Sequence, residues 1–312
     1  MTPLLLGPSG MADVPAPHET RLRALGLRLF GISCLSIMTV LIKLASDAGV
    51  KLPEIMFWRQ GLAVPVVLVA VLAGPGLASL KTQRFGAHVK RSVMGLTSMA
   101  FNFGAIILLP LAEQTTLGFA VPIFATILSA LILRESVGRH RWGAVLAGFA
   151  GVLVVVQPGG SHIPPLGALV GLSSAIMISF TSLQIRDMGR TEAAMTTVFW
   201  FSALSVLPTS LLLPFFMTSH DPYEWLLLCG IGMLGGIGQI GLTGALKLAP
   251  VSTVLGMDYI ALLWSSLFGW LIWGHVPGPA TWAGAAIIIG SGLYIALREH
   301  RLAIERTKDI IA

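Results

Sequence analysis

Ten long apolar segments constrain the fold of this chain more than any other feature of its sequence. A bilayer core about 30 Å thick is crossed by about 20 apolar residues in a helix, whereas the strands of a membrane barrel alternate polar and apolar residues. We therefore expect an all-α integral membrane protein with ten transmembrane helices. The segments are 29–46, 54–74, 92–112, 113–133, 142–157, 165–184, 193–217, 224–246, 250–273 and 281–297.

The composition agrees with a membrane protein. Hydrophobic residues make up 55% of the chain and charged residues 11%, whereas soluble domains carry about 25% charged residues. The net charge of +6 is explained by basic loops beside a membrane, so no nucleic-acid partner is expected. The two cysteines, Cys34 and Cys229, lie within apolar segments and indicate buried thiols rather than a disulfide framework.

The distribution of basic residues predicts the orientation. Of the 20 Lys and Arg residues, all but three fall on the side of the membrane that holds the N-terminus. The exceptions are Lys51 on the other side, and Lys43 and Arg59 within spans. Because cytoplasmic loops collect Lys and Arg, we expect a multi-pass protein of the bacterial inner membrane with both termini in the cytoplasm.

The spans also form an internal repeat. Three fragments of the first half recur in the second half at a nearly constant spacing. Since each half then has five spans, the second copy enters the membrane inverted. The pairs are "FWRQGLAVP" (57–65) with "FWFSALSVLP" (199–208), "NFGAIILLPLA" (102–112) with "QIGLTGALKLA" (239–249), and "WGAVLAGFAGVL" (142–153) with "WAGAAIIIGSGL" (282–293).

The loops support the inversion. The segment "RESVGRHR" carries three Arg, and its counterpart "GHVPGPAT" carries none. Inverted repeats recur in secondary transporters, whose substrate sites lie near the midplane between the halves. The predicted domains are a cytoplasmic N-terminal tail, two five-helix repeats and a cytoplasmic C-terminal tail. Their bounds are 1–28, 29–157, 158–297 and 298–312.

These residues resemble the drug/metabolite transporter superfamily, in its ten-span EamA-type branch. The resemblance rests on Lys43, on Pro53 followed by Arg59, and on "TTLGFAVPIFATILSALILRESVGRHRWGAVLAGFAGVLVV" (115–155), with a second copy over 252–295. Within that branch the chain is similar to YddG-type amino-acid exporters of the bacterial inner membrane. The second copy departs from the pattern at Ile260, which aligns with Pro122.

The resemblance implies a basket of ten helices around a central cavity. It also implies export of amino acids, especially aromatic or other hydrophobic ones, and of related metabolites by alternating access. Efflux of amphiphilic drugs or of another metabolite is the alternative within transport. A membrane-embedded enzyme or sensor would belong to another class, and it would need clustered catalytic residues at one interface or an attached soluble domain.

Two basic residues at membrane depth are candidate cavity residues. Lys43 lies about 5 Å, and Arg59 about 8 Å, from the outer ends of their spans at a helical rise of 1.5 Å. One interpretation is that both side chains extend to the outer interface. The other is that they line an outward vestibule and attract a carboxylate, which suits the planar guanidinium of Arg59.

Asp258 is the acid furthest from both surfaces, about eight residues or 12 Å into the ninth span. A structural pair with Lys, Arg or backbone amides is one interpretation. The others are contact with a substrate ammonium group and proton coupling. Asp258 and Arg59 together would bind the ammonium and carboxylate groups of a zwitterion. The neighbouring Tyr259 is a further candidate cavity residue.

Polar amides and aromatic residues complete the candidate set. Asn102 and Gln239 hold equivalent positions in the two repeats and either line the cavity or bond between helices. Trp58, Trp200 and Trp264 either pack within the bundle or form an aromatic cavity wall.

Sequence motifs of enzymes are not found. All seven histidines fall outside the predicted spans, and neither an HExxH nor a G-x-S-x-G motif occurs. No catalytic residue, metal site or cofactor is predicted. The expected partners are a small-molecule substrate and the lipid bilayer. The oligomeric state stays open, a monomer included.

Overall fold

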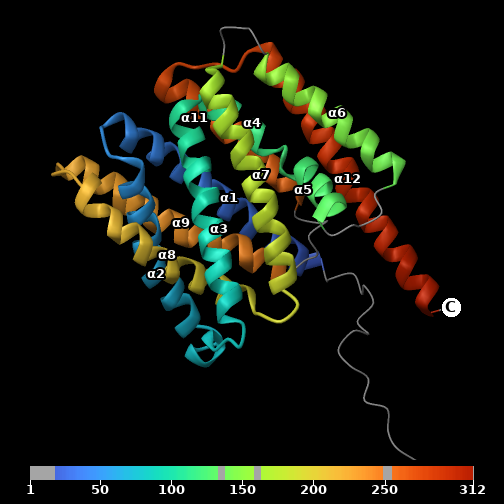
Figure 1. Ribbon diagram of the computed structural model, residues 1–312, viewed down its shortest axis with the longest axis horizontal. Coiled ribbons are helices and arrows are strands. Elements are labelled where there is room, and N and C mark those ends of the chain that lie inside the picture. Colours follow the sequence, from blue (N-terminus) through green and yellow to red (C-terminus); the bar gives the residue numbers. More distant parts are fainter. Residues whose placement is uncertain (1–17, 133–137, 158–162, 249–254, 312) are drawn as a thin grey trace, which may run out of the picture.

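The computed structural model describes residues 18–132, 138–157, 163–248 and 255–311, and within these ranges the chain is helical with no strand (Figure 1). The α-helices are α1 (His18–Asp47), α2 (Leu52–Leu72), α3 (Phe85–Leu108), α4 (Leu111–Gly118), α5 (Val121–Ile132), α6 (Arg139–Val156), α7 (Pro165–Met188), α8 (Ala194–Phe216), α9 (Pro222–Leu248), α11 (Ile260–Trp273) and α12 (Pro279–Ile311). Two short 3-10 helices are η1 (Leu77–Leu80) and η2 (Leu255–Tyr259).

The helices confirm the predicted class of fold. In the described ranges, nine helices are long and apolar enough to cross a membrane, and the shorter apolar stretch Met257–Trp273 corresponds to the predicted ninth span. Chain residues up to 17, the predicted repeat boundary at 158 and the start of the ninth span at 250 lie outside the described residues.

Two helices extend beyond the predicted spans. α1 begins at His18 rather than at 29, and α12 continues to Ile311 instead of ending at 297. Neither extension contains proline, so the backbone hydrogen bonding of the helix continues past the apolar stretch. The predicted bounds rest on hydropathy, which marks the part of a helix that lies in the bilayer and not the full length of the helix.

Two spans are broken at equivalent places in the repeats. The fourth span consists of α4 and α5, which are separated at Phe119 and Ala120. Pro122 explains this break, because proline lacks an amide hydrogen and clashes with the preceding turn. The ninth span begins as η2 and becomes α-helical only at Ile260, although that position holds no proline.

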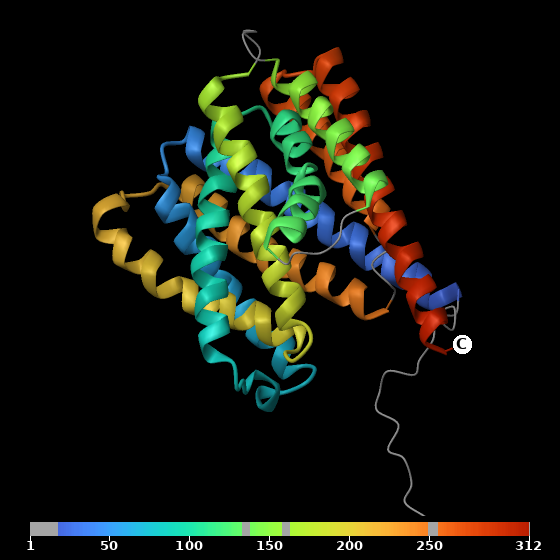
Figure 2. The same cartoon turned by 45° about the vertical axis from the view of Figure 1, so that its right-hand side comes forward.

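The helices of the two halves interleave. α1 packs on α9 and α7 packs on α3; α2 and α8 contact each other, and α6 lies along α12. These pairs map onto one another when the halves are exchanged, as an inverted repeat requires. In Figures 1 and 2, α6 and α12 form a separate pair beside the remaining helices.

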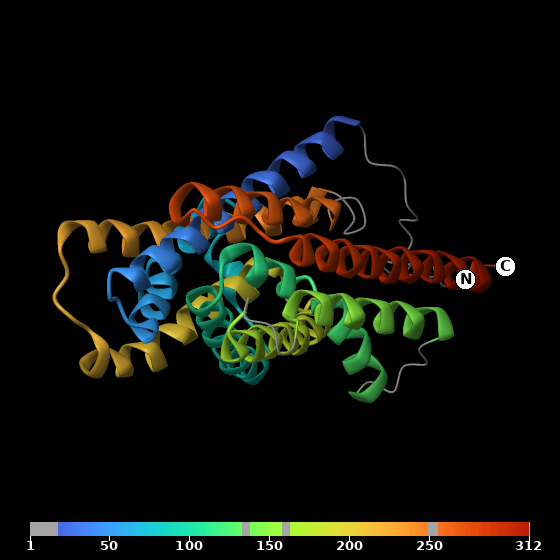
Figure 3. The ribbon, with the colours of Figure 1, turned by 90° about the horizontal axis from the view of Figure 1, so that it is seen from above.

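The bundle has two faces. Since successive spans alternate in direction, the start of α1 and the end of α12 lie on one face, which we term the terminal face. The loop that joins α8 to α9 lies on the opposite face, at the left of Figure 3, away from the end of α12 at the right.

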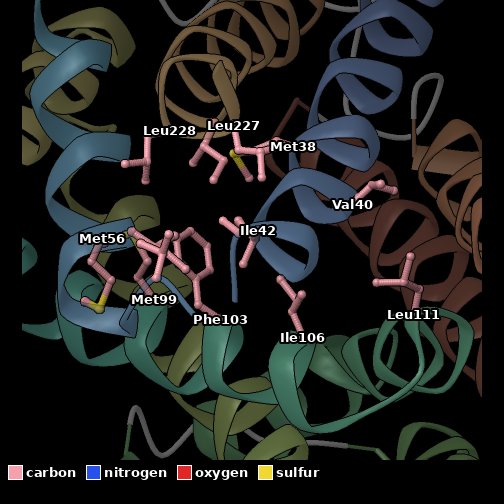
Figure 4. Packing of buried hydrophobic residues seen from close by; sticks show 14 residues of the cluster. Met38, Val40, Ile42, Met56, Met99, Phe103, Ile106, Leu111, Leu227 and Leu228 are labelled. Carbon is pink, nitrogen blue, oxygen red and sulfur yellow. The ribbon is translucent and has the colours of Figure 1, made fainter. Parts of the chain in front are cut away.

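The largest apolar core lies between α1, α2, α3 and α9 (Figure 4). Ile42, Ile55, Ile106, Leu228 and Ile231 are almost completely buried there. The view shows side chains from all four helices meeting in one cluster, so this core joins the first repeat to the second.

Glycines on α9 let its neighbours approach closely. A Cβ atom on Gly232 would lie 2.7 Å from the carbonyl oxygen of Trp58 on α2. Where α9 crosses α1, a Cβ atom on Gly31 would lie 2.9 Å from the carbonyl oxygen of Gly238. Small residues are typical of helix contacts in membranes, where close backbone approach increases van der Waals contact.

The two repeats are packed unequally. The interface of α2 with α9 is far more extensive than that of α3 with α8, although the two are related by exchange of the repeats. Gly232 and Gly95 hold equivalent positions in these interfaces. Gly232 faces Leu62 and the α2 backbone, whereas Gly95 faces the side chains of Arg91 and Phe201.

Gly232→Ala should therefore destabilise the protein by about 1–3 kcal/mol, because the added methyl group has no room against the α2 backbone. Gly290→Ala is the matched control, since that exposed helical glycine has nothing within 4 Å of an added Cβ. Thermal unfolding of both variants in detergent measures the difference. Equal melting temperatures for the two variants would contradict the close α2–α9 contact.

Candidate functional site

A cavity of about 710 Å³ lies between helices of both repeats. Its described lining comes from α1, α2, α3, α7, α8 and α9. Arg28, Glu192 and Leu246 line it at the terminal face, and Arg59 lines its deep part. A second pocket of about 300 Å³ adjoins it. The two share Arg59, Arg91, Ile178, Ser182, Ile185, Phe201 and Gln239.

Arg59 points into the cavity from α2. It is the eighth residue of that helix, which places its Cα about 10 Å from the opposite face. Its guanidinium donates a hydrogen bond to Gln60, while its Nε has no partner. Gly235 on α9 leaves room for this side chain, because an added Cβ would lie 3.3 Å from Nε. Arg59 thus lines a cavity, but this cavity reaches the terminal face and is not the outward vestibule that the sequence offered as one interpretation.

Arg91 enters the same cavity from α3. Its guanidinium carbon lies 4.3 Å from the ring centroid of Phe201, a cation–π contact with α8. Its Nε and Nη1 have no hydrogen-bond partner in the described structure. Gly95, one turn further along α3, leaves the space that the guanidinium and the ring occupy.

The two symmetry-related amides both line the cavity region. Gln239 borders both pockets, and Asn102 borders the smaller one. Asn102 Oδ1 accepts a hydrogen bond of 3.0 Å from Gln114 Nε2 and one of 3.4 Å from Ser174 Oγ. Asn102 thus faces the cavity and also bonds between helices, the two interpretations left open by the sequence.

Asp258 is held by an arginine. Arg28 Nε and Nη2 donate to its two carboxylate oxygens at 2.7 and 2.6 Å. The pair joins η2 to α1 and neutralises the charge of Arg28, which lines the cavity at the terminal face. A structural ion pair was one of the alternatives for Asp258, and the described cavity lining does not include it.

Lys43 lies at the opposite face, away from the cavity. Its Nζ donates to the carbonyl oxygens of Ile106, Ile107 and Leu109 at 3.1, 3.3 and 2.8 Å. A cation there satisfies carbonyl groups that the end of a helix leaves unpaired, here the end of α3. The structure therefore gives Lys43 a capping contact.

The predicted aromatic residues surround the cavity at a distance instead of lining it. Trp58 packs edge-on against Trp225, with ring centroids 5.0 Å apart. Trp200 Nε1 donates to the Leu80 carbonyl at 2.9 Å, and Trp264 stacks on Phe268. Tyr259 packs edge-on against Phe119. Phe201 supplies the aromatic ring in the described lining of the larger cavity.

Beyond the deep end of the cavity, the opposite face is closed by a buried cluster. His220 Nε2 lies 2.5 Å from Glu54 Oε1, and His220 Nδ1 lies 2.8 Å from Glu224 Oε2. The side chains of Glu54 and His220 are fully buried. Glu224 also forms a capping box with Asp221 at the start of α9. The cluster ties α2 of the first repeat to α9 of the second.

A second cluster that contains a histidine and a glutamate lies beside the cavity at the terminal face. His88 Nε2 lies 3.5 Å from Glu192 Oε2, and Thr82 donates to the other oxygen of Glu192 at 2.8 Å. His88 is completely buried within α3, and His18, His140 and His300 also lie in helices, so histidines outside the predicted spans are not confined to loops or tails. Helix α3 begins at Phe85, before the apolar stretch.

Comparison with known proteins settles the family. The sequence profile of the EamA-like transporter family matches residues 23–157 and again residues 165–297. The chain belongs to this family. The double match agrees with the repeat found in the sequence and with the interleaved helix pairs.

Several bacterial transporters are related to this EamA-type chain. It is 31% identical to the pseudopaline exporter of Pseudomonas aeruginosa strain UCBPP-PA14, over 81% of this chain and 89% of the relative. It is 29% identical to the riboflavin transporter of Vibrio cholerae, over 91% and 96% of the two chains. A solved crystal structure with 23% identity has a TM-score of 0.60 and covers 89% of this chain, which supports the fold.

Sequence reasoning missed Arg91 and Phe201 as residues of the EamA-type cavity. Arg91 was assigned to a basic loop because the apolar stretch begins at 92. The signal for Phe201 was its alignment with Arg59 in the repeated "FW" fragments, which places both at equivalent depths. No group of three or more His, Cys, Asp or Glu side chains that could hold a metal occurs in the described part of the chain.

The cluster at the opposite face predicts a pH-dependent contribution to stability. Burial disfavours the charged imidazole, but hydrogen bonds and charges from Glu54 and Glu224 outweigh burial and raise the pKa of His220. A raised pKa in the folded state stabilises the protein fully below the ordinary pKa of about 6.5. This contribution is lost as the pH rises through the raised value.

We expect His220→Gln to lower the melting temperature by about 3–8 °C at pH 6. The difference from the unmodified protein should shrink as the pH approaches 9. His140→Gln, at an exposed histidine at the start of α6, is the control and should leave the melting temperature unchanged. A difference that is constant between pH 6 and pH 9 would show that the imidazole charge does not contribute.

Proposed function

We propose that this EamA-type transporter exports small metabolites, with amino acids as its first candidates. The observation that carries the proposal is Arg59, whose guanidinium lacks a carboxylate partner in the described structure and lines a cavity between the two repeats. Arginine binds a carboxylate through two parallel hydrogen bonds. A substrate carboxylate would supply the missing counter-charge.

Further features of the cavity suit a small polar metabolite with an apolar part. Gln239 and Asn102 offer amide groups beside Arg59, and Ile178, Val198 and Phe201 contribute apolar surface. We assign Arg59, Gln239 and Asn102 to substrate contact. Asp258 is not assigned to a substrate ammonium group, because Arg28 already binds both of its oxygens.

The unequal packing of the repeats supports transport by alternating access. Gly232 lies against the α2 backbone in the α2–α9 interface, whereas the related α3–α8 interface is less extensive. If the α3–α8 interface became tight and the α2–α9 interface loosened, the cavity would close at the terminal face and open at the opposite face. We place both termini in the cytoplasm on the distribution of basic residues, so that the cavity opens inward.

The relatives differ in what they carry. A protein of Rickettsia prowazekii named an S-adenosylmethionine uptake transporter is 26% identical to this chain over 80% of its length. With the pseudopaline exporter and the riboflavin transporter, it shows that the family spans several metabolites and both directions of transport. The choice of amino acids therefore rests on Arg59 and on the similarity to amino-acid exporters.

Purified protein in liposomes, loaded with labelled amino acids, tests this function. We expect saturable flux, and we expect Arg59→Gln to reduce it at least about tenfold by removing a charge-assisted contact. Lys51→Gln, which removes an exposed charge before α2, is the control and should leave the flux unchanged. Flux of amphiphilic drugs without flux of any amino acid would favour the alternative substrate class.

A further inference from the structure

The cavity contains a second cation that the proposed carboxylate contact does not use. Arg91 borders both pockets together with Arg59, so two guanidinium groups of like charge line the same cavity. They come from adjacent spans, α2 and α3. Two like charges at membrane depth cost free energy unless water or a counter-charge stabilises them.

Other charged residues of the described lining already have partners. Arg28 forms its ion pair with Asp258. Glu192 accepts a hydrogen bond from Thr82 and faces His88. Within the described residues, neither Arg59 nor Arg91 forms an ion pair. The deep part of the cavity therefore carries two positive charges without a bound carboxylate.

The surroundings of Arg91 hold its guanidinium in place. Its guanidinium carbon lies 4.3 Å from the centroid of the Phe201 ring, and both residues line the two pockets. Gly95 provides the space, since any larger residue there would collide with both Arg91 and Phe201. Gly95 and Phe201 thus hold Arg91 beside the pocket, while its buried Nε and Nη1 have no hydrogen-bond partner in the described structure. This arrangement is typical of a guanidinium that binds an anion, and not of a charge on an exposed surface.

We propose that Arg59 and Arg91 together bind a substrate with two separate carboxylates, such as a dicarboxylic amino acid. The proposal rests on the proposed function and names its substrate class. Each arginine engages one carboxylate through its planar fork. A substrate with one carboxylate would leave one guanidinium unpaired, so the second negative charge gives selectivity.

The test compares ligands that differ in one charge at nearly equal size. Binding of glutamate, glutamine, aspartate and asparagine to the purified full chain is measured by calorimetry at low ionic strength, where charge pairs are least screened. We expect each acid to bind at least about tenfold more tightly than its amide. Inorganic phosphate is included as a compact dianion.

Arg91→Gln should weaken binding of glutamate about tenfold or more and leave binding of glutamine within about twofold. Lys90→Gln is the matched control, because it removes the same charge from the neighbouring, exposed position of α3. Gly95→Ala keeps both arginines but displaces the Arg91 side chain. It should therefore reproduce the loss for glutamate in a protein whose net charge is unchanged.

Each outcome decides between the two proposals. Equal binding of acids and amides, with amino-acid flux in liposomes, overturns the two-carboxylate site and leaves amino-acid export intact. Tighter binding of phosphate than of glutamate assigns the arginines to a compact dianion and also overturns it. Binding of no acid in the set overturns it as well, and absence of any amino-acid flux overturns the proposed function.

Discussion

Lack of water at membrane depth is the constraint on which this structure depends. A polar group there must find its partner within the protein, and most of the charged residues do so across the bundle. Lys43 bonds to the carbonyl end of α3, Arg28 to Asp258, and His220 to Glu54. Each contact joins segments that are distant in sequence, so the same bonds that satisfy charges also fix the helices relative to one another.

The same constraint makes the exceptions informative. Arg59 and Arg91 are the arginines of the cavity that bond to no carboxylate in the described structure, and both are supported by neighbours that leave them room. If these charges had no role in binding, we would expect a carboxylate of the protein to neutralise them, as Asp258 neutralises Arg28. This difference from Arg28 is the basis of our proposal that the cavity binds a negatively charged substrate.

How far the sequence predicts this protein depends on the range of the interactions. Span number, repeat and family follow from hydropathy and from fragments such as the paired "FW" motifs, because these are local patterns. Lys43 and Asp258 were predicted as residues at membrane depth, but their partners lie on other helices and no local signal identifies them. Arg91 was missed for a related reason. Hydropathy marks where the bilayer begins, while the start of α3 at Phe85 decides which way Arg91 points.

The crossing of α1 and α9 has a mechanical consequence. At Gly31 and Gly238 the backbones of the two helices approach closely, with the side chains of Leu35 and Leu242 packed beside the contact. Because neither glycine has a side chain to displace, a tilt of one helix about this crossing would require only Leu35 and Leu242 to repack there. The two ends of α1 would then sweep in opposite senses, so a small tilt at mid-depth becomes a wide displacement at both surfaces.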